Sequence, residues 1–292
     1  MTINYIKTRK KPGIVLHSLE DIEEQFPVLQ PGVYLLKDYG NPMAGFAPAF
    51  EPLKSVDNLV PFKSGVFTEV MDIANQFFLP ETGAKYKELQ MSQKMGLLLY
   101  GPPGTGKTCL TQLAMEEIAK NHKAICIVAT PFSIGIIEHT IKMIRKIQDN
   151  PIVVFVDEVE NAMRFDEYNY LTFLDGSESV DNFMFVGCTN FIGDIPDRIK
   201  NRKSRIKHLI EIKSLPMDVY KDYIRSKIPS ISEPKVAEFA FKCEQESLVI
   251  DQVKHAIIDY YIDGFSIDDA IKNALSEVKG GDKREPDPFD PR

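Results

Sequence analysis

The sequence predicts an α/β protein in which helices cover a parallel β-sheet, with a smaller region at each end. Three observations lead to this prediction. Apolar strand-like runs alternate with helix-like segments through residues 95–212, which is typical of a parallel sheet between helices. Residues 215–278 carry helical periodicity without strand signals. Residues 1–65 are rich in proline and glycine turns, with short strand candidates between them.

The elements follow from these patterns in chain order. Residues 13–16 and 33–36 are strand candidates, and residues 66–94 predict two helices separated at Pro80. Core strands are expected at 95–100, 124–130, 152–158, 183–190 and 208–212, and helices at 108–121, within 136–148 and near 166–174. We therefore divide the chain into an amino-terminal region of unknown role (1–65), an α/β core (66–214), a helical region (215–278) and a tail (279–292) that is polar, proline-rich and expected to be disordered.

Composition limits the classes of function. The chain has 292 residues, 43% of them hydrophobic and 26% charged, which is ordinary for a globular protein. Its net charge of -7 argues against a broad nucleic-acid-binding surface, although a local basic patch is compatible with it. No apolar run approaches the roughly 20 residues that span a bilayer. The cysteines, Cys109, Cys126, Cys188 and Cys243, form no C-x-x-C pair. We expect free thiols in a cytoplasmic protein, without a metal site at these cysteines.

Residues 101–108 read GPPGTGKT and directly follow an apolar strand-like run. The order of strand, glycine loop, lysine, hydroxyl and helix fits G-x-x-x-x-G-K-[ST]. Such a helix start binds phosphate through backbone N–H groups and the helix dipole. Lys107 is expected to reach the β- and γ-phosphates and Thr108 to hold Mg²⁺, whereas the alternative is an ordinary glycine turn. The expected nucleotide-binding residues are Gly101, Pro102, Pro103, Gly104, Thr105, Gly106, Lys107, Thr108 and Cys109.

Polar residues follow two further strands of the predicted sheet. Asp157 and Glu158 come after the run at 152–156, and this carboxylate position serves Mg²⁺ in phosphate-loop ATPases. We expect Asp157 to hold Mg²⁺ and Glu158 to act as general base on the attacking water. The alternative is that both acids cap the next helix. Asn190 follows the strand at 183–188 and could orient the water, or it could be a simple turn residue.

Three arginines, Arg198, Arg202 and Arg205, lie within eight residues of this acidic chain. One interpretation is a solvated basic face. The other is a set of arginine fingers, because a guanidinium group stabilises the charge that develops in phosphoryl transfer.

GPPGTGKT, VVFVDE, GCTN and the Arg-x-x-Arg of NRKSRI, in this order and at this spacing, resemble the AAA+ ATPase family. NRKSRI is most similar to the Arg-Pro-Gly-Arg-Phe stretch of the AAA subgroup. The resemblance covers residues 66–276 and implies a three-layer Rossmann-like ATPase core, a small helical lid, ATP and Mg²⁺ as cofactors, and a homo-oligomeric ring, usually of six. It also implies that Arg202 and Arg205 reach the nucleotide of the neighbouring subunit. LDGSES at 174–179 resembles the Leu-Asp-Gly segment through which AAA subunits communicate.

The sequence departs from the family in three places. Segment 130–139, TPFSIGIIEH, lacks the usual aromatic-glycine pore loop, and only Phe132 and Ile134 could replace it. Ile250-Asp251 stands where many relatives carry Arg-Asp, so the lid arginine that senses γ-phosphate is missing. Residues 1–65 resemble no known adaptor domain.

The function expected from these features is Mg²⁺-dependent ATP hydrolysis coupled to remodelling or disassembly of a protein partner by a ring oligomer. Two alternatives remain open. One is an ATPase that acts on DNA or RNA, which the acidic composition disfavours. The other is a nucleotide-gated scaffold whose assembly is its function, which the short pore segment favours.

Overall fold

The computed structural model describes residues 28–38, 48–53, 65–130, 134–175, 181–213 and 215–278, together with four short strands before residue 17. The chain divides into two compact units. The first comprises residues 1–59, 65–101 and 107–211, and the second comprises residues 60–64, 102–106 and 212–292. The described part of the first unit is α/β and that of the second is helical, so the predicted fold class is confirmed. The predicted tail at 279–292 lies outside the described residues.

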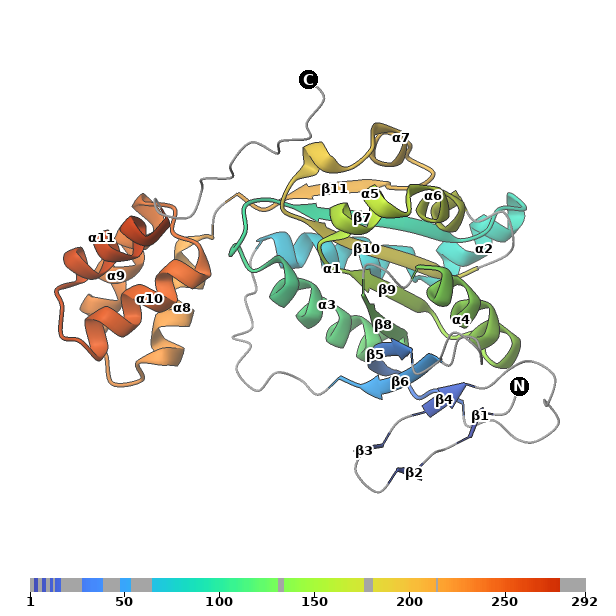
Figure 1. The fold of residues 1–292 in the computed structure, drawn as a ribbon, viewed down its shortest axis with the longest axis horizontal. Coiled ribbons are helices and arrows are strands. Elements are labelled where there is room, and N and C mark those ends of the chain that lie inside the picture. The colour runs from blue at the N-terminus through green and yellow to red at the C-terminus, as the bar shows by residue number, and fades with distance from the viewer. Residues whose placement is uncertain are drawn as a thin grey trace. The chain divides into compact units, whose positions relative to one another are not determined.

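A twisted sheet forms the centre of the first unit, and its described strands run in the order β1-β4-β6-β5-β8-β9-β10-β7-β11 (Figure 1). The strands from β5 to β11 in this order are parallel, and the remaining ones are antiparallel to their neighbours. The parallel strands are β5 (Gly32–Asp38), β8 (Ile125–Ala129), β9 (Ile152–Val156), β10 (Phe183–Thr189), β7 (Lys94–Tyr100) and β11 (His208–Glu211). The antiparallel strands are β6 (Pro48–Pro52), β4 (Ile14–Leu16) and β1 (Ile3–Asn4), and β2 (Lys7–Thr8) pairs separately with β3 (Lys11–Pro12).

The central strands form because their side chains are buried on both faces of the sheet. Every residue of β9 and of β10 is buried. A parallel strand covered on both faces reads as a continuous apolar run, and the sequence Ile152-Val153-Val154-Phe155-Val156 is such a run. This is why the sequence predicted these strands correctly.

Helices cover the sheet on both faces. The chain passes from β7 to β8 in one direction along the sheet and from β8 to β9 in the other. Because such crossovers are right-handed, the helices that make them lie on opposite faces. The packing agrees, since α1 contacts α3, whereas α4 and α5 contact α6. These helices are α1 (Gly65–Phe77), α2 (Pro80–Glu88), α3 (Lys107–His122), α4 (Ile134–Ile147), α5 (Val159–Phe165), α6 (Glu167–Asp175) and α7 (Asp197–Lys200), with a 3-10 turn η2 at Ile192–Asp194.

The amino-terminal strands extend the same sheet. β5 pairs in parallel with β8, with Val33 opposite Cys126, and β6 then pairs with β5 in the antiparallel sense. The strand candidates at 13–16 and 33–36 coincide with β4 and β5. The sequence did not indicate that these strands join the core sheet, and the domain boundary at residue 65 stays a prediction.

The second unit is built from α8 (Met217–Lys227), α9 (Glu233–Gln245), α10 (Ile250–Tyr261) and α11 (Ile267–Val278). α8 packs on α9 and α10 on α11, around the fully buried side chains of Tyr220 and Phe239. Within this unit the Ile250 N–H, at the start of α10, donates to the Gly104 carbonyl oxygen at 2.9 Å. None of the helices in the described ranges is both long enough and apolar enough to cross a membrane.

Candidate functional site

The topology brings three predicted site segments to one edge of the sheet. Gly101, Asp157 and Asn190 follow the carboxyl ends of β7, β9 and β10, which are neighbouring parallel strands. The Gly101 N–H lies 3.4 Å from the Thr189 carbonyl oxygen, so the ends of β7 and β10 are in direct contact. The carboxyl edge of an open parallel sheet is the usual place for ligands.

The glycine loop turns sharply between β7 and α3. Gly104 and Gly106 have φ angles of 77° and 83°, in the left-handed region that a side chain disfavours. Lys107 is the first residue of α3, is 6% exposed, and donates from Nζ to the Gly101 carbonyl oxygen at 2.8 Å. The loop thus places a lysine ammonium group beside the start of a long helix, where backbone N–H groups lack helical partners.

The electrostatics of Lys107 favour an anionic ligand. Burial is the largest influence and lowers the pKa of Lys107, while Cys188, Asp157 and Glu160 act in the opposite direction. A phosphate group bound at the helix start would compensate the buried positive charge.

Thr108 and Asp157, the two predicted Mg²⁺ ligands, are brought together. The Thr108 hydroxyl donates to Asp157 Oδ2 at 2.6 Å. The next residue, Glu158, is exposed and has φ 47° and ψ 45°, a left-handed conformation that turns the chain from β9 into α5. Its N–H donates to Asp157 Oδ1 at 3.0 Å, and Asn161 Nδ2 lies 3.5 Å from Glu158 Oε2. Glu158 therefore stands beside the Thr108–Asp157 pair on the exposed side.

Glu160 is a third acid at this edge that the sequence analysis missed. It is 4% exposed, and its Oε1 accepts a hydrogen bond from the Asn190 N–H at 3.3 Å. Its Oε2 is buried and has no hydrogen-bond partner in the part of the chain that the structure describes. The acidic run at 157–160 was the available signal, but α5 was not predicted, so the direction of this side chain could not be inferred.

The residues at this edge fit a magnesium ion. Mg²⁺ prefers oxygen ligands and retains several waters, so it needs few protein groups. The Thr108 hydroxyl and the Asp157 carboxylate supply such oxygens 2.6 Å apart. Glu160 Oε2, which has no hydrogen-bond partner among the described residues, is a further buried acceptor on α5.

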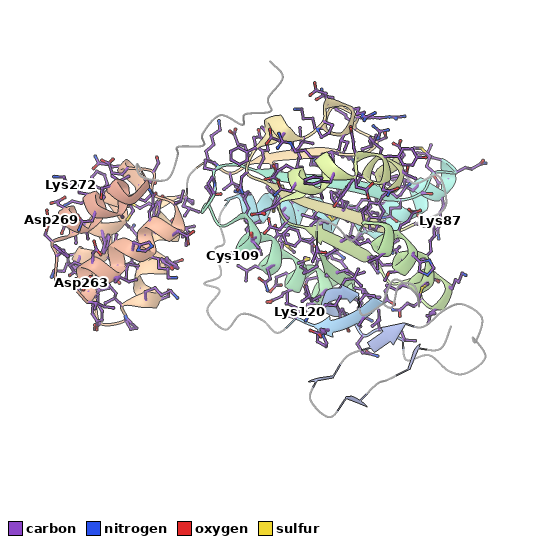
Figure 2. The ribbon with its side chains drawn as sticks, viewed as in Figure 1. Lys87, Cys109, Lys120, Asp263, Asp269 and Lys272 are labelled. Carbon is purple, nitrogen blue, oxygen red and sulfur yellow. The ribbon has the colours of Figure 1, made fainter. Side chains whose placement is uncertain are left out.

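Cys109 lies on α3 directly after the glycine loop (Figure 2). Burial is the main cause that raises the pKa of this half-buried thiol to about 11, and Glu116 adds to it. All four cysteines are free, and the other three, Cys126, Cys188 and Cys243, are buried.

The three arginines, Arg198, Arg202 and Arg205, lie away from the glycine loop. A Cβ atom added to Gly96 would come within 2.0 Å of the Arg205 carbonyl oxygen, so the backbone of Arg205 rests against Gly96. Gly96 lies five positions before Gly101, or about 16 Å at roughly 3.3 Å per residue. The Arg205 side chain pairs with Asp175, and Arg198 pairs with Glu167. The arginine cluster is therefore separate from the glycine loop of its own chain.

Two further predicted segments are described only in part. Asp175 of the 174–179 segment is described, while residues 176–180 are outside the described ranges. Phe132 of the pore segment also falls outside them, and Ile134 is 2% exposed and belongs to the hydrophobic core. Within the described residues, this segment therefore gives no support for a pore loop at Ile134.

A cavity of about 610 Å³ lies away from the glycine loop. Its lining includes the corner between α1 and α2, together with Arg145 and Asp181. Arg145 donates to the backbone carbonyl oxygens of Asn150, Asp181 and Asn182. Its guanidinium group therefore serves the local structure, and the cavity contains none of the predicted site residues.

Comparison with known proteins agrees with this geometry. Residues 97–214 match the family described as "ATPase family associated with various cellular activities (AAA)". A proteasome-activating nucleotidase from Saccharolobus solfataricus is 25% identical over 236 residues, covering 71% of this chain and 59% of that protein. One from Sulfurisphaera tokodaii is 29% identical over 168 residues, covering 51% and 42%. A proteasome-associated ATPase from Nakamurella multipartita is 25% identical over 279 residues, covering 80% and 46%.

The chain spans about half the length of these curated relatives. The AAA match begins in β7 and ends after β11, so it contains the glycine loop, the acidic strand end, Asn190 and the arginine cluster. The resemblance inferred from the four motifs is confirmed. Residues 97–214 of this chain match the AAA ATPases, a family of phosphate-loop nucleoside triphosphatases.

Proposed function

We propose that this protein hydrolyses ATP with Mg²⁺ and uses the energy to remodel a protein partner as a ring oligomer. The hydrogen bond between Thr108 and Asp157, beside Lys107 in an AAA domain, is the observation that carries the proposal. It joins the glycine loop to the acidic strand end, the two parts that Mg²⁺-nucleotide binding requires.

Each residue at the carboxyl edge has a proposed role. The loop residues Gly101 to Cys109 hold the phosphates, with Lys107 at the β- and γ-phosphates. Thr108 and Asp157 hold Mg²⁺, which when bound neutralises charge on the phosphate oxygens. Glu158 takes the proton of the attacking water as general base, and its exposed position beside Asp157 suits that role. Asn190 orients the same water.

The arginine pair Arg202 and Arg205 is proposed to serve the site of a neighbouring subunit. The backbone of Arg205 lies about 16 Å along β7 from the glycine loop of its own chain. The pair can therefore take part in hydrolysis only at the site of a second copy of this chain. Phe165 and Tyr168 are 80% and 78% exposed on the connected helices α5 and α6. Exposed aromatic side chains are common at protein interfaces. We propose a ring of six, the usual number in this family.

A protein partner is favoured over nucleic acid. The relatives are named as proteasome-activating or proteasome-associated ATPases, and the net charge of -7 disfavours a nucleic acid partner. The same proposal includes a cytoplasmic location.

Two substitutions test the hydrolysis mechanism. Lys107→Ala should abolish ATP binding, because the ammonium group contacts phosphate in the ground state. Glu158→Gln should bind ATP and turn it over at least about 10²-fold more slowly, because a general base acts only in the transition state. Isothermal titration with ATP and a steady-state phosphate-release assay measure the two effects. A Glu158→Gln protein with turnover within about threefold of the wild type would remove Glu158 from the mechanism.

The partner class is tested by adding polymers to the wild-type protein. An unfolded protein should raise ATP turnover, whereas single-stranded DNA or RNA should not. Stimulation by nucleic acid alone would replace the proposed partner. Turnover that responds to none of these polymers, in an oligomer that forms only with ATP, would favour a nucleotide-gated scaffold.

A further inference from the structure

Arg205 is held within its own subunit by three hydrogen-bonding nitrogens. Its Nε donates to Asp175 Oδ1 at 2.6 Å and its Nη2 to Asp175 Oδ2 at 2.5 Å, a bidentate pair. Its Nη1 donates to the Arg198 carbonyl oxygen. The side chain is 8% exposed. Such a geometry is typical of an arginine that fixes a local structure.

Arg202, three residues earlier, is held differently. Its Nη1 lies 3.6 Å from Asp175 Oδ2, beyond ordinary hydrogen-bond length, and its side chain is 60% exposed. The Arg205 N–H donates to the Arg202 carbonyl oxygen at 2.8 Å. The two arginines therefore belong to one tight turn, in which one guanidinium group is buried and the other faces outwards.

Asp175 connects this turn to the core. It ends α6, and the Lys94 ammonium group, at the start of β7, donates to its carbonyl oxygen at 3.0 Å. The Arg205 hydrogen bond is the largest cause that lowers the pKa of Asp175, so the carboxylate is charged at neutral pH. Removing Arg205 from this pair would leave a charged, partly buried acid without its main partner, which is unfavourable. Arg205 is thus poorly placed to swing towards another molecule.

We propose that Asp175 and Arg205 form a pair that positions the turn at residues 202–206, and that Arg202 alone contacts the nucleotide bound by a neighbouring subunit. The inference rests on the proposed function, because that nucleotide is the ligand of Arg202. Arg202 is then a catalytic residue, whereas Asp175 and Arg205 are positioning residues. This assigns different roles to two arginines that the sequence motif presents as equivalent.

A kinetic double-mutant cycle tests this division of roles. Arg202→Ala should lower kcat by about 10³-fold or more, as loss of an arginine finger does. Asp175→Asn and Arg205→Ala should each lower kcat by about 10–10²-fold, the effect of a misplaced catalytic group. The double variant Asp175→Asn/Arg205→Ala should be no slower than the slower single variant, because both remove the same pair. Asp175→Glu, which keeps a carboxylate, should recover part of the loss.

The matched control is the exposed bidentate pair of Arg225 and Glu233, with contacts of 3.0 and 2.7 Å. Arg225→Ala should leave kcat within about threefold of the wild type, as surface substitutions usually do. Mass photometry checks that each variant forms the same oligomer. If Arg205→Ala loses as much kcat as Arg202→Ala, while Asp175→Asn stays within threefold of the wild type, Arg205 is itself the contact and the proposal is wrong.

A urea-unfolding cycle on Asp175→Asn, Arg205→Ala and the double variant needs no ATPase activity. Non-additive shifts in the unfolding midpoint are expected, and additive shifts would overturn the pair. If the wild-type protein shows no ATP turnover, the proposed function is refuted. The pairing of Asp175 with Arg205 is still tested in that case, because the unfolding cycle does not depend on turnover.

Discussion

At the scale of single residues, Glu160 combines two unusual properties. It is an acid that is 4% exposed, and one of its two carboxylate oxygens has no hydrogen-bond partner among the described residues. The other oxygen accepts from the Asn190 N–H at the end of β10. Buried acids are costly unless paired. The hydrogen bond from the Asn190 N–H to Glu160 therefore connects the end of β10 to α5.

This role predicts different outcomes for two substitutions of Glu160. Glu160→Ala leaves the Asn190 N–H without its acceptor, which costs about 1–3 kcal/mol and lowers the melting temperature by about 2–4 °C for each kcal/mol. Glu160→Gln keeps an acceptor oxygen and should melt close to the wild type. Differential scanning calorimetry without nucleotide measures both. Equal losses would show that the negative charge stabilises the fold and that the acceptor oxygen does not.

At the scale of elements, the turn at residues 202–206, called the arginine turn below, packs against β7 at Gly96, which has no side chain. A Cβ atom at Gly96 would lie 2.0 Å from the Arg205 carbonyl oxygen and 3.0 Å from its carbonyl carbon. Both are backbone atoms, so the turn itself would have to move. The Gly96 carbonyl oxygen also accepts from the Lys207 N–H at 2.8 Å, which aligns the chain as it enters β11.

Gly96→Ala should therefore destabilise the protein by about 1–3 kcal/mol, as overpacking does. It should also lower kcat without weakening ATP binding, because the displaced turn carries Arg202. Gly135→Ala in α4 is the matched control, since among the described residues no atom outside the neighbouring backbone of its own helix lies within 4 Å of the added methyl group. The control should be unchanged or slightly more stable, because alanine favours helix. Urea unfolding and steady-state kinetics compare the two variants. A Gly96→Ala protein as stable as Gly135→Ala would contradict the close packing of Gly96 against Arg205.

The elements differ in how far the sequence predicts them. The central strands were predictable, because residues buried on both faces form continuous apolar runs such as 152–156. α5 was missed, since its seven residues are too few to show helical periodicity and it begins after the left-handed Glu158. The place of β5 in the core sheet was missed, because its partner Cys126 is remote in sequence from Val33 and pairing leaves no local signal.

The same limit applies to the candidate site. A motif identifies Lys107, Thr108 and Asp157, because phosphate and Mg²⁺ require those residue types at a known spacing. The pairing of Arg205 with Asp175 joins residues 30 positions apart, at the end of α6 where the Asp175 carbonyl oxygen also accepts from Lys94 of β7. No spacing rule predicts that pair, so the sequence could identify both arginines without separating their roles.

At the scale of the whole molecule, the proposed role of Arg202 implies that the site in each single chain is incomplete. The glycine loop and the acids lie at the carboxyl edge of the sheet, and the arginine turn lies about 16 Å away along β7. If Arg202 acts on a neighbour, an isolated subunit lacks its charge at the γ-phosphate. Turnover per subunit should then fall steeply on dilution into a monomeric range, as judged by mass photometry.

Mixing two inactive variants tests the shared site more directly. Lys107→Ala subunits lack the phosphate contact and keep Arg202, whereas Arg202→Ala subunits keep Lys107 and lack the arginine. Each protein alone should be inactive. In mixed oligomers, some interfaces join an intact glycine loop to an intact Arg202, because the two groups come from different chains, and phosphate release should return in part. A mixture of Lys107→Ala with the double variant Lys107→Ala/Arg202→Ala is the control and should stay inactive, since no subunit has a working loop. If mixed oligomers form, shown by co-purification of differently tagged chains, and no activity returns, then Arg202 does not act across an interface.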